Sequence, residues 1–356
     1  MLIIDAHLDL AWNALQWNRN LQQSVYTIRA QENQLAEVGR GQNTVALPEM
    51  RKGRVALCFA TLLARSTGQA VAHVDYLSPQ QAYAVAQGQL NYYRALQEVG
   101  EIRLINNLPD LESHMAAWQD WEKDPLRSQP EPGLIVSMES ADPILKPEQL
   151  SAWKEAGLRI IGPAHYGAGR YAGGTSTELG LTSDGKALLR EMERLGIILD
   201  LTHLSDQAFW EAMEIFNGPV LASHNNCRAL VPHQRQFSNE QLHAIVERDG
   251  VIGAAFDNWM IRPGWSRGAT EKPPVTMAHV VDHIDHVCQL AGDNGHAAIG
   301  SDLDGGFGRE QSPSDLDTIA DLQKICEILS KRGYSDMDIP AIMHGNWLRL
   351  LRNAWK

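Results

Sequence analysis

Short apolar runs recur along the whole chain, and several of them end in a polar or ionisable residue. The eight strongest runs are rich in β-branched and other apolar residues, which is typical of buried strands. They span residues 2–9, 54–63, 134–139, 158–165, 197–203, 219–224, 251–257 and 297–302. The pattern therefore predicts eight strands, spread from one end of the chain to the other.

Segments with helical start and stop signals separate most of these strands. A helix opens at Ser78-Pro79, and residues 147–156 and 184–195 each stop at a glycine. Ser238 with Gln241 three residues later forms a capping box, and the helix after it stops at a glycine just before the next strand. Strands and helices are thus expected in alternation.

Apolar strands that alternate with amphipathic helices indicate a parallel sheet covered on its outer face. Eight such units suggest an α/β fold in which one (β/α)₈ TIM barrel makes up a single domain over residues 1–356. An open, doubly wound sheet is the competing arrangement. Residues 106–132, rich in Pro, Asp, Glu and Trp, are interpreted as an excursion on one unit, with an extra strand at 102–106.

Composition favours a small-molecule partner. The 356 residues are 44% hydrophobic, which is enough for a large core, and their formal net charge is −12. Lys and Arg are scattered rather than gathered in a stripe, which argues against a nucleic-acid surface. We therefore expect a small substrate and no nucleic acid.

Compartment is inferred from the cysteines and the N-terminus. The four cysteines are far apart and without C-x-x-C spacing, so we expect reduced thiols at Cys58, Cys227, Cys288 and Cys326. No basic region precedes the first apolar run, which Asp5 interrupts, and no apolar stretch of about 18 residues is present. A cytoplasmic protein without signal peptide or membrane anchor is expected.

Ionisable residues fall at the C-terminal ends of the predicted strands. In a (β/α)₈ barrel this rim is where active sites form. The residues concerned are His7, Asp9, Glu139, His165, His203, His224 and Asp302. The pattern predicts that all seven side chains meet in one site.

Several of these residue types suit a pair of metal ions. Alternation along a strand points His7 and Asp9 the same way, and a Glu such as Glu139 can bridge two cations with its two oxygens. His203 and His224 can supply neutral nitrogens to the second ion. For any one histidine, a hydrogen-bonded place in the core is the more common outcome, but several on consecutive rim positions favour a metal site.

Asp302 follows the last strand within Ile299-Gly-Ser-Asp302-Leu-Asp-Gly-Gly. A carboxylate there can accept a proton from metal-bound water and later deliver it. The alternative is an Asp that only forms a turn, which is how we interpret Asp304-Gly305.

The ordered set of these residues resembles the membrane dipeptidase family (renal dipeptidase, peptidase family M19) of the amidohydrolase superfamily. The resemblance covers essentially the whole chain and rests on His7-x-Asp9, Glu139, His165, His203, His224, Arg235 and Gly300-Ser-Asp302. It implies a zinc-dependent metallo-dipeptidase that hydrolyses the amide bond of dipeptides, including L-D dipeptides. It also implies that two copies pair as a homodimer.

The resemblance further implies two Zn²⁺ ions per chain, bridged by Glu139 and a hydroxide. His7 and Asp9 would complete the set for one ion, and His203 and His224 the set for the other. Each remaining site residue has an implied role. His165 would contact the substrate carbonyl or oxyanion, Arg235 would bind the terminal carboxylate, and Asp302 would shuttle the proton.

Two features depart from the family pattern. Many members have Glu-Gly-Gly-His where this chain has Glu139-Ser-Ala-Asp142, and His165 follows Gly-Pro-Ala instead of a Thr-rich run. The metal set is complete, so we expect the differences to affect the lining of the pocket. Arg228 is an alternative to Arg235 as the carboxylate ligand, although the spacing from His224 favours Arg235.

Two other functions fit the same residues. One is a related binuclear amidohydrolase acting on a lactam, lactone or N-acyl amino acid, and the other is a metal-binding barrel that does not catalyse.

Two further motifs are interpreted without a catalytic role. His279, His283 and His286 share one face of a solvated helix, and Gly167–Gly174 is expected as a flexible loop beside the site.

Overall fold

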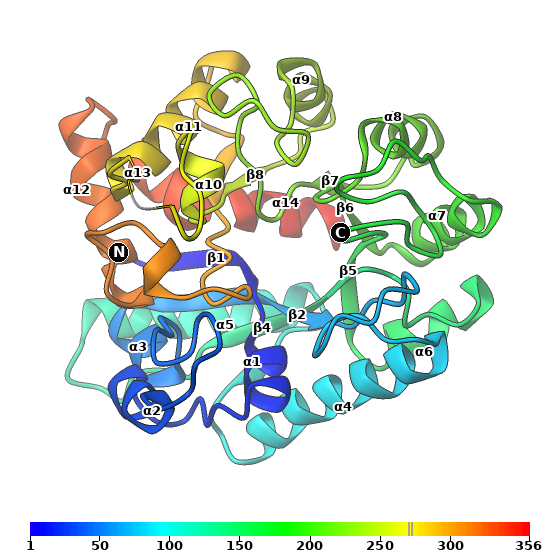
Figure 1. Cartoon of the computed structure of the whole chain (residues 1–356). Helices are drawn as coiled ribbons and strands as arrows, with labels where there is room; N and C mark the ends of the chain where they lie inside the picture. The colour runs from blue at the N-terminus through cyan, green and yellow to red at the C-terminus, as the bar shows by residue number, and fades with distance from the viewer. Residues whose placement is uncertain (270, 272) are drawn as a thin grey trace.

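Eight parallel strands form a nearly closed barrel at the centre of the structure, a computed structural model that describes residues 1–269, 271 and 273–356 (Figure 1). Their order around the sheet is β7-β6-β5-β4-β2-β1-β9-β8. An isolated bridge between Ala222 and Ile252 joins the two ends of this order. The (β/α)₈ barrel predicted from the sequence is therefore confirmed, and the open sheet is excluded.

Each barrel strand overlaps one of the eight predicted runs. In chain order the strands are β1 (Ile3–Leu8), β2 (Val55–Leu63), β4 (Gly133–Glu139), β5 (Leu158–Gly162), β6 (Ile198–Asp200), β7 (Val220–Leu221), β8 (Ile252–Ala254) and β9 (Ala297–Ile299). Asp5 of β1 pairs with Ile299 of β9, so the first and last strands are neighbours.

Helices surround the strands on the outside (Figure 1). The α-helices are α1 (Leu10–Gln16), α2 (Val25–Glu32), α3 (Leu47–Lys52), α4 (Pro79–Glu98), α5 (Leu108–Lys123), α6 (Leu150–Glu155), α7 (Ser183–Leu195), α8 (Asp206–Ile215), α9 (Asn239–Glu247), α10 (Asn258–Ile261), α11 (Met277–Ala291), α12 (Lys324–Lys331), α13 (Asp338–Pro340) and α14 (Asn346–Ala354). Short helical turns are η1 (Pro147–Gln149), η2 (Arg309–Gln311), η3 (Ile319–Gln323) and η4 (Ala341–Gly345). Among the described residues, no helix is both long and apolar enough to cross a bilayer.

The helix ends follow the signals in the sequence. The Ser78 side chain caps α4 by accepting from the Gln81 amide, and Ser238 with Gln241 forms the predicted capping box of α9. Gly196 ends α7 with φ of 66°, a left-handed conformation that glycine adopts without a steric penalty.

The expected excursion lies between α4 and β4. Its extra strand is confirmed as β3 (Arg103–Leu104), which pairs in parallel with β4 outside the barrel order. Residues 106–132 are more regular than the composition suggests, because most of them form α5. Asn107 caps that helix, and Trp118 on it is fully buried.

The apolar core has two layers, one inside the barrel and one between the strands and the outer helices. The inner layer gathers strand residues such as Ile4 and Phe59 with Trp118 of α5 and Trp347 of α14. Trp347 packs on Phe59 with ring centroids 5.3 Å apart, and its indole N–H donates to the Ile299 carbonyl. The barrel interior is thus a packed core, and the site residues lie at the C-terminal ends of the strands.

Candidate active site

The predicted site residues occupy equivalent places around the barrel. His7 lies in β1, Asp9 follows that strand, and Glu139 is the last residue of β4. The other four each lie three residues beyond the end of a strand: His165 after β5, His203 after β6, His224 after β7 and Asp302 after β9. Because parallel strands end at the same edge, these side chains converge at one mouth of the barrel.

Glu139 is at the centre of the cluster. Its Oε1 lies 3.1 Å from Nε2 of His203 and 3.4 Å from Nε2 of His224, and its Oε2 lies 3.7 Å from Nε2 of His7. The two carboxylate oxygens therefore face different histidines. This is the arrangement that a carboxylate shared between two cations requires.

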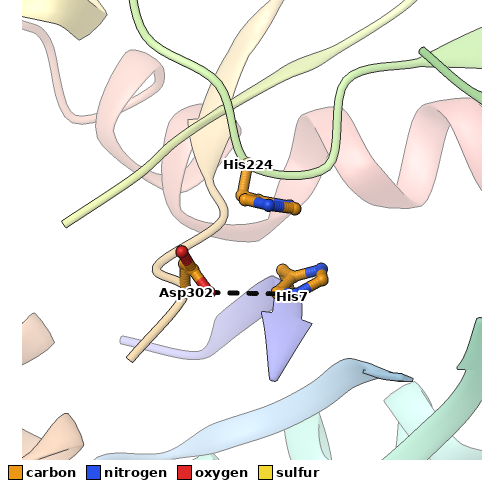
Figure 2. A group of neighbouring side chains, drawn as sticks. All are labelled: His7, His224 and Asp302. Carbon is orange, nitrogen blue, oxygen red and sulfur yellow. Dashed lines mark ion pairs between the residues drawn. The ribbon is translucent and has the colours of Figure 1, made fainter. Parts of the chain in front are cut away.

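Three groups of side chains are arranged closely enough to hold a metal ion. They are His7, Asp9 and Glu139; Glu139, His203 and His224; and His7, His224 and Asp302. Figure 2 shows the third group, in which Asp302 lies 3.9 Å from the His7 ring nitrogen. The sequence separated Asp302 from the metal ligands, but the geometry brings it into contact with the same cluster.

Two buried atoms of the cluster have no hydrogen-bond partner in the described part of the chain. They are Nε2 of His7 and Oδ1 of Asp9, which are 3.9 Å apart. A buried polar atom without a partner is costly, and a cation between a nitrogen and a carboxylate oxygen would satisfy both. The residues present therefore fit a divalent metal ion.

The charges in the cluster also favour a cation. Burial lowers the pKa of His7, but Glu139, Asp9 and Asp302 outweigh this and raise it to about 10. Burial raises the pKa of Glu139 to about 7 and that of Asp302 well above its usual value. The carboxylates thus need positive charge beside them, which a proton on His7 or a metal ion can provide.

His203 and His224 are held with one nitrogen toward Glu139. Nδ1 of His203 lies 2.9 Å from the Thr175 hydroxyl, and Nδ1 of His224 lies 2.9 Å from the Ser223 hydroxyl. Burial and neighbouring positive charge lower the pKa of both imidazoles well below the usual value. Neutral, oriented imidazoles are suitable metal ligands.

Two buried carboxylates tie the strand ends together beneath the site. Asp5 accepts hydrogen bonds from the Ser301 amide and hydroxyl, which joins β1 to the turn that carries Asp302. Asp200 accepts from the Thr202 and Ser223 amides, which joins the segments that carry His203 and His224. These bonds fix the spacing of the site residues across strands.

A cavity of about 180 Å³ opens beside the cluster. Its walls combine site residues with apolar and aromatic side chains. They are Asp9, Trp12, Leu63, Val74, Glu139, His165, Tyr166, His203, His224, Arg235, Asp257, Met260, Asp302, Gly305 and Gly306. Six of the seven rim residues line this cavity together with Arg235, and His7 contacts the cluster from behind.

The structure distinguishes between the two candidate arginines. Arg235 lines the cavity, is 2% exposed, and donates to Asn225 Oδ1 and the His224 carbonyl. Arg228 instead forms a two-pronged ion pair with Asp206 and does not line the cavity. Of the two, only Arg235 is placed to meet a ligand.

The departure at Asp142 is an anchor between loops. Asp142 is fully buried, and its carboxylate accepts from the Ser66 and Arg170 amides. In the loop at Gly167–Gly174, a backbone bridge pairs Ala168 with Gly173, and another pairs Tyr166 with Thr175 at its two ends. The backbone of this loop is therefore paired, while its flexibility stays a prediction.

The three histidines of α11 contact neighbouring chain segments, and the solvated helix that the sequence suggested is wrong, because α11 packs on the core and His283 is 1% exposed. His283 accepts from the Cys227 amide and contacts the Ile261 carbonyl, and His286 contacts Asn239 Oδ1. His279 accepts from the Thr276 amide. Each imidazole thus holds neighbouring chain segments in place.

Sequence reasoning missed several residues at the cavity. Asp257 lines it, and Arg65 supports His165 from behind. Asp257 ends the run 251–257 that was predicted as a strand, so the rule that selected the other seven would have included it, whereas Arg65 lies two residues beyond the run 54–63. Tyr166 and Met260 carry no comparable signal.

Comparison with known proteins gives a consistent picture. The family model described as "Membrane dipeptidase (Peptidase family M19)" matches residues 1–356. A Klebsiella pneumoniae protein described as "Uncharacterized protein in pqqA 5'region" is 33% identical over 215 residues, which are 58% of this chain and 76% of that protein. "Dipeptidase tcpJ" of Claviceps purpurea is 32% identical over 214 residues, which are 58% of this chain but only 47% of that protein.

Among solved structures, a Rhodobacter sphaeroides metallo peptidase has the same fold. It is described as bound to a phosphinate mimic of the dipeptide L-Ala-D-Ala. The match has a TM-score of 0.78 and 22% sequence identity, and it covers 100% of this chain and 99% of that one.

Proposed function

Because the chain belongs to the membrane dipeptidase family, peptidase family M19, we propose that it is a zinc-dependent dipeptidase that cleaves the amide bond of a dipeptide. One observation carries the proposal. Seven ionisable side chains from six strand ends converge around Glu139 at the mouth of one cavity.

Two zinc ions would share Glu139. His7 and Asp9 would complete one set of ligands, and His203 and His224 the other. When bound, the ions would supply Lewis acidity that activates a shared water molecule and polarises the scissile carbonyl. The unpartnered His7 and Asp9 atoms support this proposal, since both are buried at the first of these positions.

His165 and Arg235 would bind the substrate. Nε2 of His165 lies 3.9 Å from Glu139 Oε1 and the side chain lines the cavity, where it can donate to the carbonyl oxygen. Arg235 offers a cation for the terminal carboxylate of the dipeptide. A cavity that contains both a buried cation and a metal cluster suits a short substrate with a free carboxylate.

Asp302 would move the proton from the attacking water to the leaving amine. Its side chain is 15% exposed, lines the cavity and lies against His7. Burial raises its pKa well above the usual value, which favours a carboxyl group that can both take and give a proton.

The substrate class extends to L-D dipeptides. The Rhodobacter sphaeroides relative is described with a mimic of L-Ala-D-Ala, and this chain has the same fold over its full described length.

The four free cysteines support a reducing, cytoplasmic compartment, and a homodimer is proposed from the family alone.

One experiment tests site and reaction together. Protein purified without chelator is analysed for zinc and assayed with L-L and L-D dipeptides, N-acyl amino acids and lactones. We expect two zinc ions per chain and turnover of dipeptides. Asp302→Asn should retain near two ions and reduce kcat by about 10²- to 10⁴-fold, because that is what a positioned acid-base group contributes.

The matched control is Asp336→Asn, an exposed carboxylate outside the cavity lining. It should leave both zinc content and kcat unchanged. Normal turnover by Asp302→Asn would contradict the role of that residue. A zinc-loaded protein inactive on every dipeptide, or more active on lactones, would contradict the proposed function.

A further inference from the structure

Arg65 is a buried cation behind the substrate cavity that the proposed function does not use. It lies two residues beyond the end of β2 and is 8% exposed. Its guanidinium Nη1 lies 3.0 Å from Nδ1 of His165, on the side of the ring away from Glu139. A charged side chain in this position bears directly on the hydrogen bonding of His165.

The guanidinium of Arg65 is fixed in place. Its Nε donates to Oδ2 of Asp75 at 2.9 Å, and the Asp75 side chain is fully buried. Asp75 also accepts from the amide and hydroxyl of Thr67. The main chain of Arg65 bonds on both sides, to the Val74 carbonyl and the Tyr76 amide. Both ends of the side chain are therefore held.

The chemistry of a guanidinium determines which ring nitrogen of His165 carries the proton. All nitrogens of arginine donate and none accepts, so the Nδ1 that faces Arg65 must act as the acceptor. A neutral imidazole whose Nδ1 accepts carries its proton on Nε2. The Arg65 guanidinium at 3.0 Å leaves no acceptor for a proton on Nδ1 of His165.

We propose that Arg65, held by Asp75, is a positioning residue that fixes His165 in the tautomer with the proton on Nε2. His165 then presents an N–H toward the cavity and can act only as a hydrogen-bond donor there. It stabilises negative charge on the carbonyl oxygen and takes no proton from water, which leaves proton transfer to Asp302. This consequence for catalysis rests on the proposed function, whereas the tautomer itself does not.

A purely structural role for Arg65 makes a different prediction. The Arg65–Asp75 pair also closes the loop between these two residues. If that were its only role, removing the pair would lower stability without changing the proton position on His165. The experiment therefore reads the tautomer directly.

The test uses zinc-loaded protein with ¹⁵N-labelled histidine, in which loss of signals in His165→Asn assigns the ring nitrogens. In the unsubstituted protein, Nδ1 of His165 should have the chemical shift of an unprotonated nitrogen and Nε2 that of a protonated one. Arg65→Met should shift both signals toward averaged values. Arg65→Lys should keep the original pattern, because an ammonium also only donates.

Kinetics provides the second readout. Arg65→Met should lower kcat by about ten- to a hundredfold, less than the about 10²- to 10³-fold cost of removing an oxyanion donor outright. KM should change much less, because Arg65 does not line the cavity. Arg65→Lys should recover most of kcat, and Asp75→Asn should act in the same direction as Arg65→Met.

The matched control is Arg51→Met, which removes another arginine of an ion pair, Arg51–Glu101, remote from the cavity lining. It should leave kcat and the His165 signals unchanged. The proposal is overturned if unsubstituted His165 carries its proton on Nδ1, or if Arg65→Met leaves the signals unchanged. If no dipeptide is cleaved, the proposed function fails, but the signals still decide the tautomer.

Discussion

At the scale of single residues, Arg235 combines two roles. Its two Nη groups donate to Asn225 Oδ1 and the His224 carbonyl, at 2.6 and 2.9 Å. Its Nε is buried and has no partner in the described part of the chain. The guanidinium is therefore anchored to the segment that carries His224 while it retains a donor and a full charge at the cavity.

Replacing this cation should lower kcat/KM more for dipeptides with a free C-terminal carboxylate than for dipeptides with an amidated C-terminus. A hydrogen bond to a charged group contributes about 1.5–3 kcal/mol, or about ten- to a hundredfold in binding. Arg235→Met should therefore lower kcat/KM by about that factor for a dipeptide with a free carboxylate. For a C-terminally amidated dipeptide, kcat/KM of the variant is compared with that of the unsubstituted protein on the same substrate. This ratio should fall far less, because the amide offers no carboxylate to Arg235. Equal losses on both substrates would contradict the role.

The residues of the site were largely predictable one by one. Asp9, Glu139 and His203 each end a predicted apolar run, and a polar residue at such a position is visible in the sequence. The buried residues that hold the site segments in place were not predictable in this way. Asp142 contacts Ser66, and Asp304 contacts the Thr44 amide and hydroxyl. Such partners are distant in sequence, so no local pattern indicates them.

At the scale of elements, strand positions were predicted better than strand lengths. Buried parallel strands are apolar throughout, which makes the runs easy to recognise. Yet β6 to β9 have only two or three paired residues each, while the predicted runs continue to the site residues. Beyond the last pair the chain turns: His203 and Asp302 have φ of 69° and 57°. A positive φ is uncommon outside glycine, and although His and Asp adopt it more readily than most residues, the apolar pattern does not mark where this turn begins.

Asp317 joins α2 to the segment before η3. Burial raises its pKa, but hydrogen bonds from Arg309, Tyr26 and Arg29 outweigh this and lower it to about 2. A carboxylate with a lowered pKa stabilises the fold above its unfolded value near 3.8, and this contribution is lost as the pH falls toward 2. The contact is therefore expected to stabilise the protein at neutral pH and not in strong acid.

Asp317→Asn tests this contact. Its side chain is 39% exposed, so solvent screening limits the expected loss at pH 7 to about 1 kcal/mol. The measurement is the free energy of unfolding in urea at several pH values, with Asp336→Asn as the exposed control. The difference from the unsubstituted protein should shrink between pH 4 and pH 2. A difference that stays constant over this range would contradict the assignment.

At the scale of the whole molecule, we propose that residues 1–356 fold as one domain whose stability depends on the metal ions. The apolar core inside the barrel joins the first strand to α14 near the C-terminus. The buried carboxylates of the site repel one another without a cation between them. Ions that bind only the folded chain add to its stability.

Removing metal with a chelator should therefore lower the melting temperature in a single calorimetric transition. At a free zinc concentration of 100 times Kd, each ion adds about 2.7 kcal/mol, and added zinc should restore the original value. Glu139→Gln should melt at similar temperatures with and without zinc. Two separate transitions would contradict one domain, and no response to zinc would contradict the metal site.

The place of β1 between β2 and β9 has a consequence for synthesis. β1 pairs with both neighbours, yet β9 is translated after all the other strands of the barrel. During translation, His7 and Asp9 therefore lie at an open edge of the sheet until β9 and Asp302 have been made. The rim around His7 and Asp9 therefore reaches its final geometry only after the last barrel strand has been made and has paired with β1.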